Sequence, residues 1–155
     1  MAQSLSRLWT HLIFSTKDRF PFLADEQIRR DMHAYLATVL RSHDCETLIV
    51  DGAKDHVHSL FALSRKHSIS VIVMKEVKRT SSGWIKDISS AHRKFRWQNG
   101  YGAFSVSQSH LDRVRKYVER QEQHHRRVTF DDDDDEYRAF LRKYQIDYEE
   151  RYVWD

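Results

Sequence analysis

The apolar residues of this chain change their spacing several times, from the pattern of a strand to that of a helix and back. Residues 7–15, 45–50 and 55–63 are short runs rich in aromatic and branched side chains, which predicts strands. Between the first two runs, apolar residues recur at three- and four-residue intervals after Asp25, which is the stripe of an amphipathic helix. A short glycine-containing turn joins the last two runs, so we expect them to form an antiparallel hairpin.

The second half of the chain continues this alternation. A helix that Ser68 can cap is expected to reach about Trp84, followed by a strand and loop over 95–107 and a helix over about 108–124. The order β-α-β-β-α-β plus an added helix predicts an α+β, ferredoxin-like fold, with one antiparallel sheet and two helices on one face. With neither a repeat nor a linker, we expect a single domain over 1–155: a core over about 1–107, the added helix at about 108–125, and an acidic connection and tail over 126–155.

Charge is distributed unevenly between the body of the chain and its end. Residues 1–130 carry a balance of +9, whereas residues 131–155 carry −6 and include five consecutive aspartates at 131–135. A basic body suits a polyanionic partner such as a nucleic acid, and ordinary solubility is the equally good alternative. We interpret the acidic run as a solvated connection rather than a metal site, because adjacent like charges repel one another.

Composition excludes several classes of protein. With one cysteine, Cys45, the chain forms neither an internal disulfide nor a multi-cysteine zinc site. No apolar run approaches the ~18 residues of a membrane span, and the first residues lack the basic-then-apolar pattern of a signal peptide. We therefore expect a soluble, cytoplasmic protein with no membrane partner.

Two pairs of residues are candidates for chemistry. His56 and His58 stand two apart on a predicted strand, so both imidazoles face one side and can share a divalent metal ion; a pair of surface or core-edge histidines is the alternative. Tyr117 and Gln121 stand four apart on a predicted cationic helix and share a face. The tyrosine hydroxyl there can meet a phosphate, whereas the alternative is a ring that packs against the sheet.

Four segments of the chain resemble the insertion-sequence-200-like transposases, which are single-tyrosine members of the HUH (His, hydrophobic, His) endonuclease superfamily. They are, in order, Asp55-His-Val-His-Ser-Leu, Trp97-Gln-Asn-Gly-Tyr-Gly-Ala-Phe-Ser-Val-Ser107, Val114-Arg-Lys-Tyr-Val-Glu-Arg-Gln-Glu-Gln-His-His125 and Tyr148-Glu-Glu-Arg-Tyr-Val-Trp154. The resemblance implies a ferredoxin-like fold, His56 and His58 as the metal-binding pair, Tyr117 as the nucleophile, and Gln121 as the residue that completes the metal site.

The resemblance also implies an activity and partners. The tyrosine of such an enzyme attacks a phosphodiester of single-stranded DNA, leaves a 5′-phosphotyrosine and a free 3′-hydroxyl, and rejoins strands without ATP. The expected partners are DNA hairpins near the ends of a mobile element, a divalent ion (Mg²⁺ or Mn²⁺), and a second subunit whose tyrosine helix can serve the first subunit's histidines. Three alternatives remain: a domesticated relative acting on palindromic repeats, a non-catalytic nucleic-acid-binding module, and a metal phosphoesterase that uses water.

Basic residues interleaved with tryptophans suggest where DNA would bind. Lysine and arginine meet phosphates, and aromatic rings stack on unpaired bases. The alternative is a solvated helix whose tryptophans, Trp84 and Trp97, belong to the core. The predicted DNA contacts are Lys17, Arg19, Lys75, Lys78, Arg79, Lys94 and Arg96.

Overall fold

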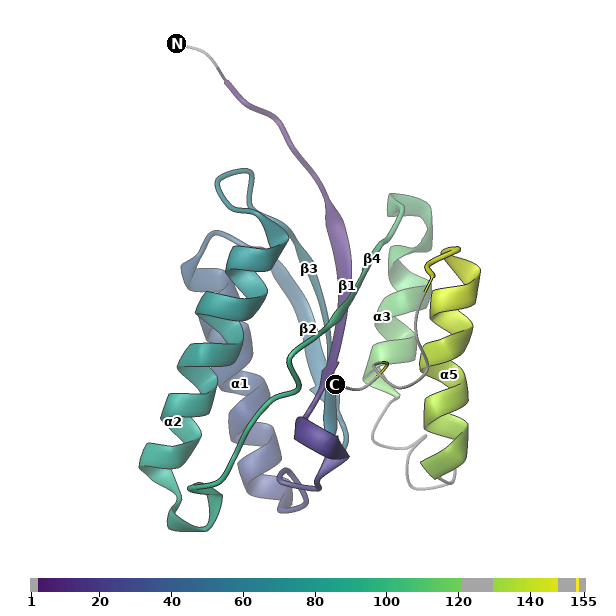
Figure 1. Ribbon diagram of the computed structural model, residues 1–155. Helices are drawn as coiled ribbons and strands as arrows, with labels where there is room; N and C mark the ends of the chain where they lie inside the picture. Colours follow the sequence, from purple (N-terminus) through teal and green to yellow (C-terminus); the bar gives the residue numbers. More distant parts are fainter. Residues whose placement is uncertain (1–2, 121–129, 148–152, 154–155) are drawn as a thin grey trace.

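The computed structural model describes residues 3–120, 130–147 and 153, which form an antiparallel sheet with helices on both faces (Figure 1). The strands are β1 (Trp9–Ser15), β2 (Thr47–Gly52), β3 (His56–Ala62) and β4 (Gly102–Ser105). The helices are α1 (Glu26–Ser42), a π-helical segment (Val71–Arg79) that continues into α2 (Thr80–Ile88), α3 (Leu111–Glu119) and α5 (Phe130–Lys143). Short 3₁₀ turns lie at Lys17–Arg19, Ser90–His92 and Gln108–His110.

The sheet has the strand order β2-β3-β1-β4, with every neighbouring pair antiparallel. This is the ferredoxin-like arrangement, and it confirms the fold class predicted from the sequence. In the central pair, Ser15 of β1 lies opposite His56 of β3, and Ile13 lies opposite His58. All seven residues of β3 are buried, because this strand lies inside the sheet and both of its faces are covered.

One face of the sheet packs against α1, the π-helical segment and α2. The α1 helix begins as predicted at Asp25, whose carboxylate accepts a hydrogen bond from the Ile28 amide at 2.9 Å. Side chains from alternate positions of β1 and β3 meet the apolar stripes of these helices and exclude water, which is the main stabilising contribution to the fold. The fully buried members of this cluster include Leu12, Phe14, Met32, Val57, Phe61 and Ile72.

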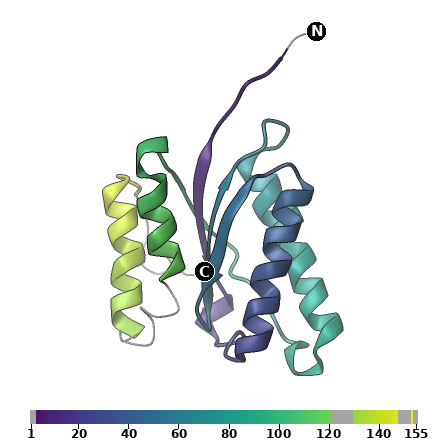
Figure 2. The ribbon, with the colours of Figure 1, turned by 180° about the vertical axis from the view of Figure 1, so that it is seen from behind.

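The other face of the sheet is covered by α3 and α5, as both ribbon views show (Figures 1 and 2). Residues of β1 and β4 pack there against α5, and a neighbouring cluster joins the sheet to α3. The opposite view in Figure 2 keeps the same three layers, with the sheet in the middle. The site described below lies between the sheet and this second helical layer.

The acidic run departs from expectation. We expected residues 131–135 to be a solvated connection, but they form the first turns of α5. The physical reason is that negative charge is favourable at the N-terminal end of a helix, where the unpaired amides give the helix dipole its positive end.

The segment expected to be a strand and a loop, residues 95–107, has its loop first and its strand second. The fourth strand covers only Gly102–Ser105, while Phe95 and Trp97 belong to the preceding loop and are nevertheless buried. Trp97 forms an isolated bridge with Thr16, which anchors this loop beside the end of β1. Among the described residues, no helix has the length and apolar character needed to cross a membrane.

Candidate active site

His56 and His58 point from β3 toward the layer of α3 and α5. They share a face because the side chains of a strand alternate, and Val57 between them joins the core on the other face. Both histidines are buried, and their ring centroids lie 5.3 Å apart at an interplanar angle of 72°. The strand thus presents two imidazoles side by side, as the sequence predicted.

A buried ion pair lies behind His56. The Nδ1 of His56 donates to the Asp55 carboxylate at 2.8 Å, and the Nε of Arg19 donates to the other oxygen of that carboxylate at 3.2 Å. Burial by itself raises the pKa of Asp55, but the hydrogen bond from His56 and the charge of Arg19 outweigh it and hold the pKa below its usual range. Asp55 therefore stays ionised and fixes the ring orientation and tautomer of His56.

Arg19 reaches Asp55 through an unusual turn at the end of β1. Asp18 and Arg19 both have positive φ angles, 55° and 53°, which is the left-handed region that residues with a Cβ rarely adopt. The turn is held by the Thr16 amide, which donates to the Asp55 carbonyl at 2.8 Å, and by the Thr16 hydroxyl. Strained backbone of this kind is typical of functional sites, where the surrounding contacts compensate for it.

The hairpin that carries the histidines needs a glycine at its tip. A Cβ added to Gly52 would lie 2.2 Å from the carbonyl oxygen of His56. Only a residue without a side chain allows the returning chain to approach so closely, and the Ala53 amide then bonds this same carbonyl at 2.9 Å. The glycine thus sets the start of β3 and the position of its first histidine.

His58 is held by a residue to which the sequence analysis assigned no role. The Nε2 of His11, on the neighbouring strand β1, lies 3.0 Å from the Nδ1 of His58, and the two rings stack at 25°. His11 is buried, and burial lowers its pKa to about 4, so its imidazole is neutral at pH 7. Only the pairing of β1 with β3 brings these residues together, because they are far apart in the sequence.

Tyr117 projects from α3 onto the same group of rings. Its ring centroid lies 5.8 Å from that of His58, 6.1 Å from that of His11, and 5.7 Å from that of Phe140 on α5. The predicted nucleophile and the predicted metal-binding pair therefore come together within one chain. The Tyr117 ring also packs against other rings. Its placement is therefore compatible both with a hydroxyl that meets a phosphate and with a ring that packs against the sheet. Gln121 lies outside the described residues.

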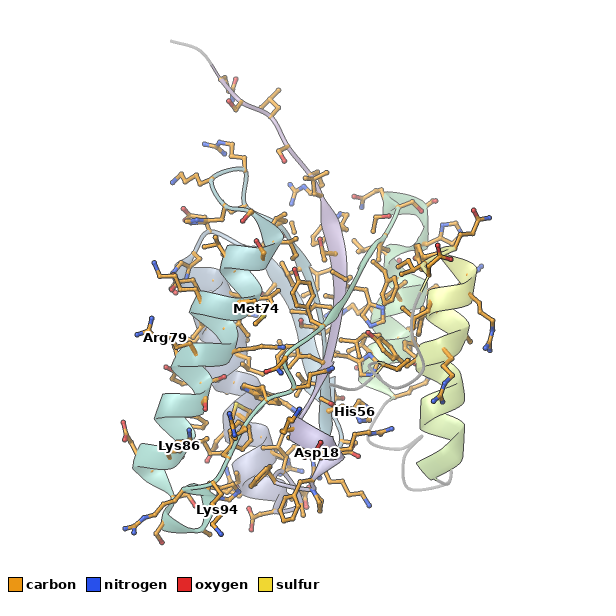
Figure 3. The ribbon with its side chains drawn as sticks, in the orientation of Figure 1. Asp18, His56, Met74, Arg79, Lys86 and Lys94 are labelled. Carbon is orange, nitrogen blue, oxygen red and sulfur yellow. The ribbon has the colours of Figure 1, made fainter. Side chains whose placement is uncertain are left out.

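The predicted DNA contacts divide into exposed and buried groups. Figure 3 shows Arg79 and Lys94 on the helical layer of α2, across the sheet from α3 and α5. Lys17 is partly exposed at the turn after β1, whereas Arg19 is buried against Asp55. Arg79 and Lys94 therefore lie away from the histidines, whereas Arg96 lies beside the turn after β1, where its carbonyl accepts a hydrogen bond from the Lys17 amide at 2.8 Å. The exposed members of the set are Lys75, Arg79, Lys94 and Arg96.

Lys78 is the clearest exception among the predicted DNA contacts. Its side chain is buried, and its ammonium group donates to the carbonyl of Gln98 at 2.9 Å and contacts the carbonyls of Asn99 and Gly100. Burial lowers the pKa of Lys78 to about 8. In this structure the charge stabilises a loop instead of facing solvent, and a three- to four-residue helical spacing could not distinguish the two placements.

The tryptophans belong to the protein interior. The indole of Trp97 is buried and donates to the Ser81 hydroxyl at 2.9 Å. Trp84 is partly buried, with its ring stacked on Tyr35 at 4.6 Å between centroids. The structure therefore favours the core interpretation for Trp97 and a packing role for Trp84.

Comparison with known proteins gives one family. The profile of the IS200-like transposases matches residues 4–121. Similar solved structures include a protein from Deinococcus radiodurans R1 assigned as a transposase, with 22% identity over 79% of this chain and 96% of the other and a TM-score of 0.60. A REP-associated tyrosine transposase bound to a REP hairpin has 14% identity over 78% of this chain and 68% of the other, with a TM-score of 0.52. No curated protein matches. Because the profile spans most of the chain and all four strands, the chain belongs to the IS200-like transposase family.

Proposed function

We propose that this chain cleaves and rejoins single-stranded DNA, with Tyr117 as the nucleophile and with His56, His58 and Gln121 as ligands of a divalent metal ion. The observation that carries the proposal is the contact between the Tyr117 and His58 rings, 5.8 Å apart within one chain. A protein that only binds nucleic acid has no need of a phenol beside two imidazoles whose Nδ1 atoms are both fixed by buried hydrogen bonds. Membership of a transposase family supports the same function.

The histidine pair fits a divalent ion. Because the Nδ1–H of His56 donates to Asp55, its Nε2 carries the lone pair that a metal needs. Among the described residues no cluster of three or more His, Cys, Asp or Glu side chains could hold a metal. We propose the amide of Gln121 as the third protein ligand because the resemblance to the family assigns it that role. Carbonyl and water oxygens suit both Mg²⁺ and Mn²⁺, and these are the two ions we propose.

Cleavage follows from the position of the phenol. The Tyr117 oxygen attacks phosphorus and gives its proton to solvent, while the bond from phosphorus to the 3′ oxygen breaks and that oxygen takes up a proton from solvent and leaves as a hydroxyl. When bound, the metal ion supplies Lewis acidity that offsets charge growing on the phosphate. The rings of His11 and Phe140 hold the Tyr117 ring in place. Attack by a 3′-hydroxyl on the 5′-phosphotyrosine reverses the step without ATP, because one phosphoester replaces another.

The proposed substrate is single-stranded DNA that folds into a hairpin. The neighbour bound to a REP hairpin supports this choice, and it also supports the alternative of a relative that acts on palindromic repeats. A homodimer remains a prediction. The exposed cations on the α2 layer are proposed phosphate contacts for the DNA outside the site.

A covalent adduct is the direct test. The protein is incubated with hairpin-bearing single-stranded DNA and Mn²⁺, and a denaturing gel is examined for DNA that migrates with the protein. We expect Tyr117→Phe to abolish the adduct while DNA binding persists, and His56→Ala to abolish it through loss of the metal. Tyr35→Phe is the matched control, because this tyrosine lies on α1 in the other helical layer, and it should retain the adduct.

Each alternative function predicts a different result. A phosphoesterase that uses water would cleave DNA without an adduct, and Tyr117→Phe would leave its activity intact. A binding module would give neither cleavage nor adduct in any variant. Either result, with folded wild-type protein, would overturn the proposed function.

A further inference from the structure

His11 occupies a special position beside the candidate metal site. It lies on β1, where the register places it on the same face as His58, and it is only 1% exposed. Its Nε2 is 3.0 Å from the Nδ1 of His58, within hydrogen-bond distance. Among the described residues, three aromatic rings also lie near its ring: Phe104 at 6.4 Å, Phe140 at 5.3 Å and Tyr117 at 6.1 Å between centroids.

The number of protons on the two imidazoles allows only two forms of the hydrogen bond between His11 and His58. Two neutral imidazoles share one bridging proton, which belongs either to His11 Nε2 or to His58 Nδ1. If His11 donates, the remaining proton of His58 is on its Nε2, and that nitrogen cannot bind a metal. If His58 donates, its Nε2 carries a lone pair, and His11 Nε2 is the acceptor. Only the second arrangement is compatible with a metal bound at His58 Nε2.

We propose that His11 is a positioning residue that accepts the Nδ1 proton of His58 and so holds His58 in its metal-binding tautomer. This inference rests on the proposed function, in which His58 is a metal ligand. The two ligands are then supported differently: His56 donates to the Asp55 carboxylate, whereas His58 donates to a buried imidazole. With a metal bound at its Nε2, His58 would keep the bridging proton on Nδ1 and His11 would accept it.

The first test measures the affinity for Mn²⁺ alone, by calorimetry or electron paramagnetic resonance, without DNA. His11→Phe keeps a ring in the aromatic cluster but removes the acceptor, and we expect it to weaken binding about tenfold or more, the usual effect of losing a partner of a metal ligand. His11→Gln offers an amide oxygen close to the lost nitrogen and should restore affinity to within a few fold. His67→Phe is the control, because His67 contacts His43 outside the site, and it should bind as the wild type does.

The second test uses the wild-type protein and does not depend on any variant folding. Nitrogen-15 shifts of the imidazoles are recorded with and without Zn²⁺ as a diamagnetic ion. In the loaded protein we expect His58 to be protonated at Nδ1 and His11 to be unprotonated at Nε2. A proton on His11 Nε2 in the loaded protein would overturn the inference.

The two proposals fail in different ways. If His56→Ala and His58→Ala both bind Mn²⁺ like the wild type, the metal site itself is wrong. If those variants lose the metal while His11→Phe binds like the wild type, only the positioning role of His11 fails.

Discussion

The ring of Tyr117 meets the ring of His58 at 5.8 Å and 78°, and both residues belong to the same chain. The α3 helix that carries the tyrosine lies against β2 and β3, the hairpin that carries the histidines. Rings at this distance and angle make a favourable edge-to-face contact, which helps to hold the helix in place. The geometry therefore favours an active site assembled from one chain.

Assembly within one chain predicts a result for mixed subunits. When His56→Ala protein is mixed with Tyr117→Phe protein, each chain lacks one half of its own site, and we expect no covalent adduct with hairpin DNA. Gel analysis with chains of two sizes identifies the labelled subunit, and wild-type protein mixed with either variant is the positive control. An adduct on the His56→Ala chain would show instead that the tyrosine serves the partner's histidines.

Removal of the Asp55 charge should destabilise the protein strongly. Asp55→Asn leaves Arg19 buried beside a neutral amide, and breaking a buried pair in this way costs about 3–5 kcal/mol. Chemical denaturation measures the loss in the free energy of unfolding. Asp44→Asn is the control, because the ion pair of Asp44 with Lys66 is on the surface and its loss should have little effect.

The same carboxylate predicts a pH dependence of stability. The pKa of Asp55 is held below its usual range in the folded protein, so the unfolded state takes up the proton first as the pH falls. The stabilisation from Asp55 is thus complete above the ordinary aspartate pKa of about 4 and is lost as the pH falls through the lower, folded value. Denaturation curves of the wild type should show this slope, and the same slope in Asp55→Asn would contradict the assignment.

Lys78 and Arg79 are adjacent in sequence but should behave differently. Lys78→Met removes the hydrogen bonds to the loop carbonyls and should cost about 1–3 kcal/mol of stability, with little change in the salt dependence of DNA binding. Arg79 is exposed, and Arg79→Met should leave stability near that of the wild type. If Arg79 contacts a phosphate, the slope of log affinity against log salt falls by about 0.7 for single-stranded DNA. The opposite pattern would place Lys78 on the DNA.

Gly102 determines how closely α5 packs against the sheet. A Cβ at this position would lie 2.7 Å from the hydroxyl oxygen of Tyr137 and 2.8 Å from its Cε2, so Gly102→Ala should cost about 1–3 kcal/mol through overpacking. Gly83→Ala is the control, since its Cβ would meet nothing within 4 Å on α2, and it should gain up to about 1 kcal/mol. Thermal denaturation measures both changes. In a Tyr137→Leu background Gly102→Ala should cost less, and an equal cost would exclude this contact.

Local patterns in the sequence were sufficient for the order of the elements and for part of the site. The alternation along β3 places His56 and His58 on one face and Val57 on the other, whichever strands pair with it. Asp25 begins α1 because its carboxylate reaches an amide only three residues away. Such relationships involve neighbours in the chain, so backbone geometry alone determines them.

The supports of that site were decided by the tertiary structure. His11 meets His58 only because β1 pairs with β3 in one register, and Arg19 reaches Asp55 only through a turn with positive φ angles. The spacing of basic residues along the helix predicts that Lys78 is exposed, yet the loop at 98–100 covers it. These contacts join residues distant in sequence, and they form only when the whole sheet is buried between two helical layers. The spacing of residues within one segment therefore does not predict them.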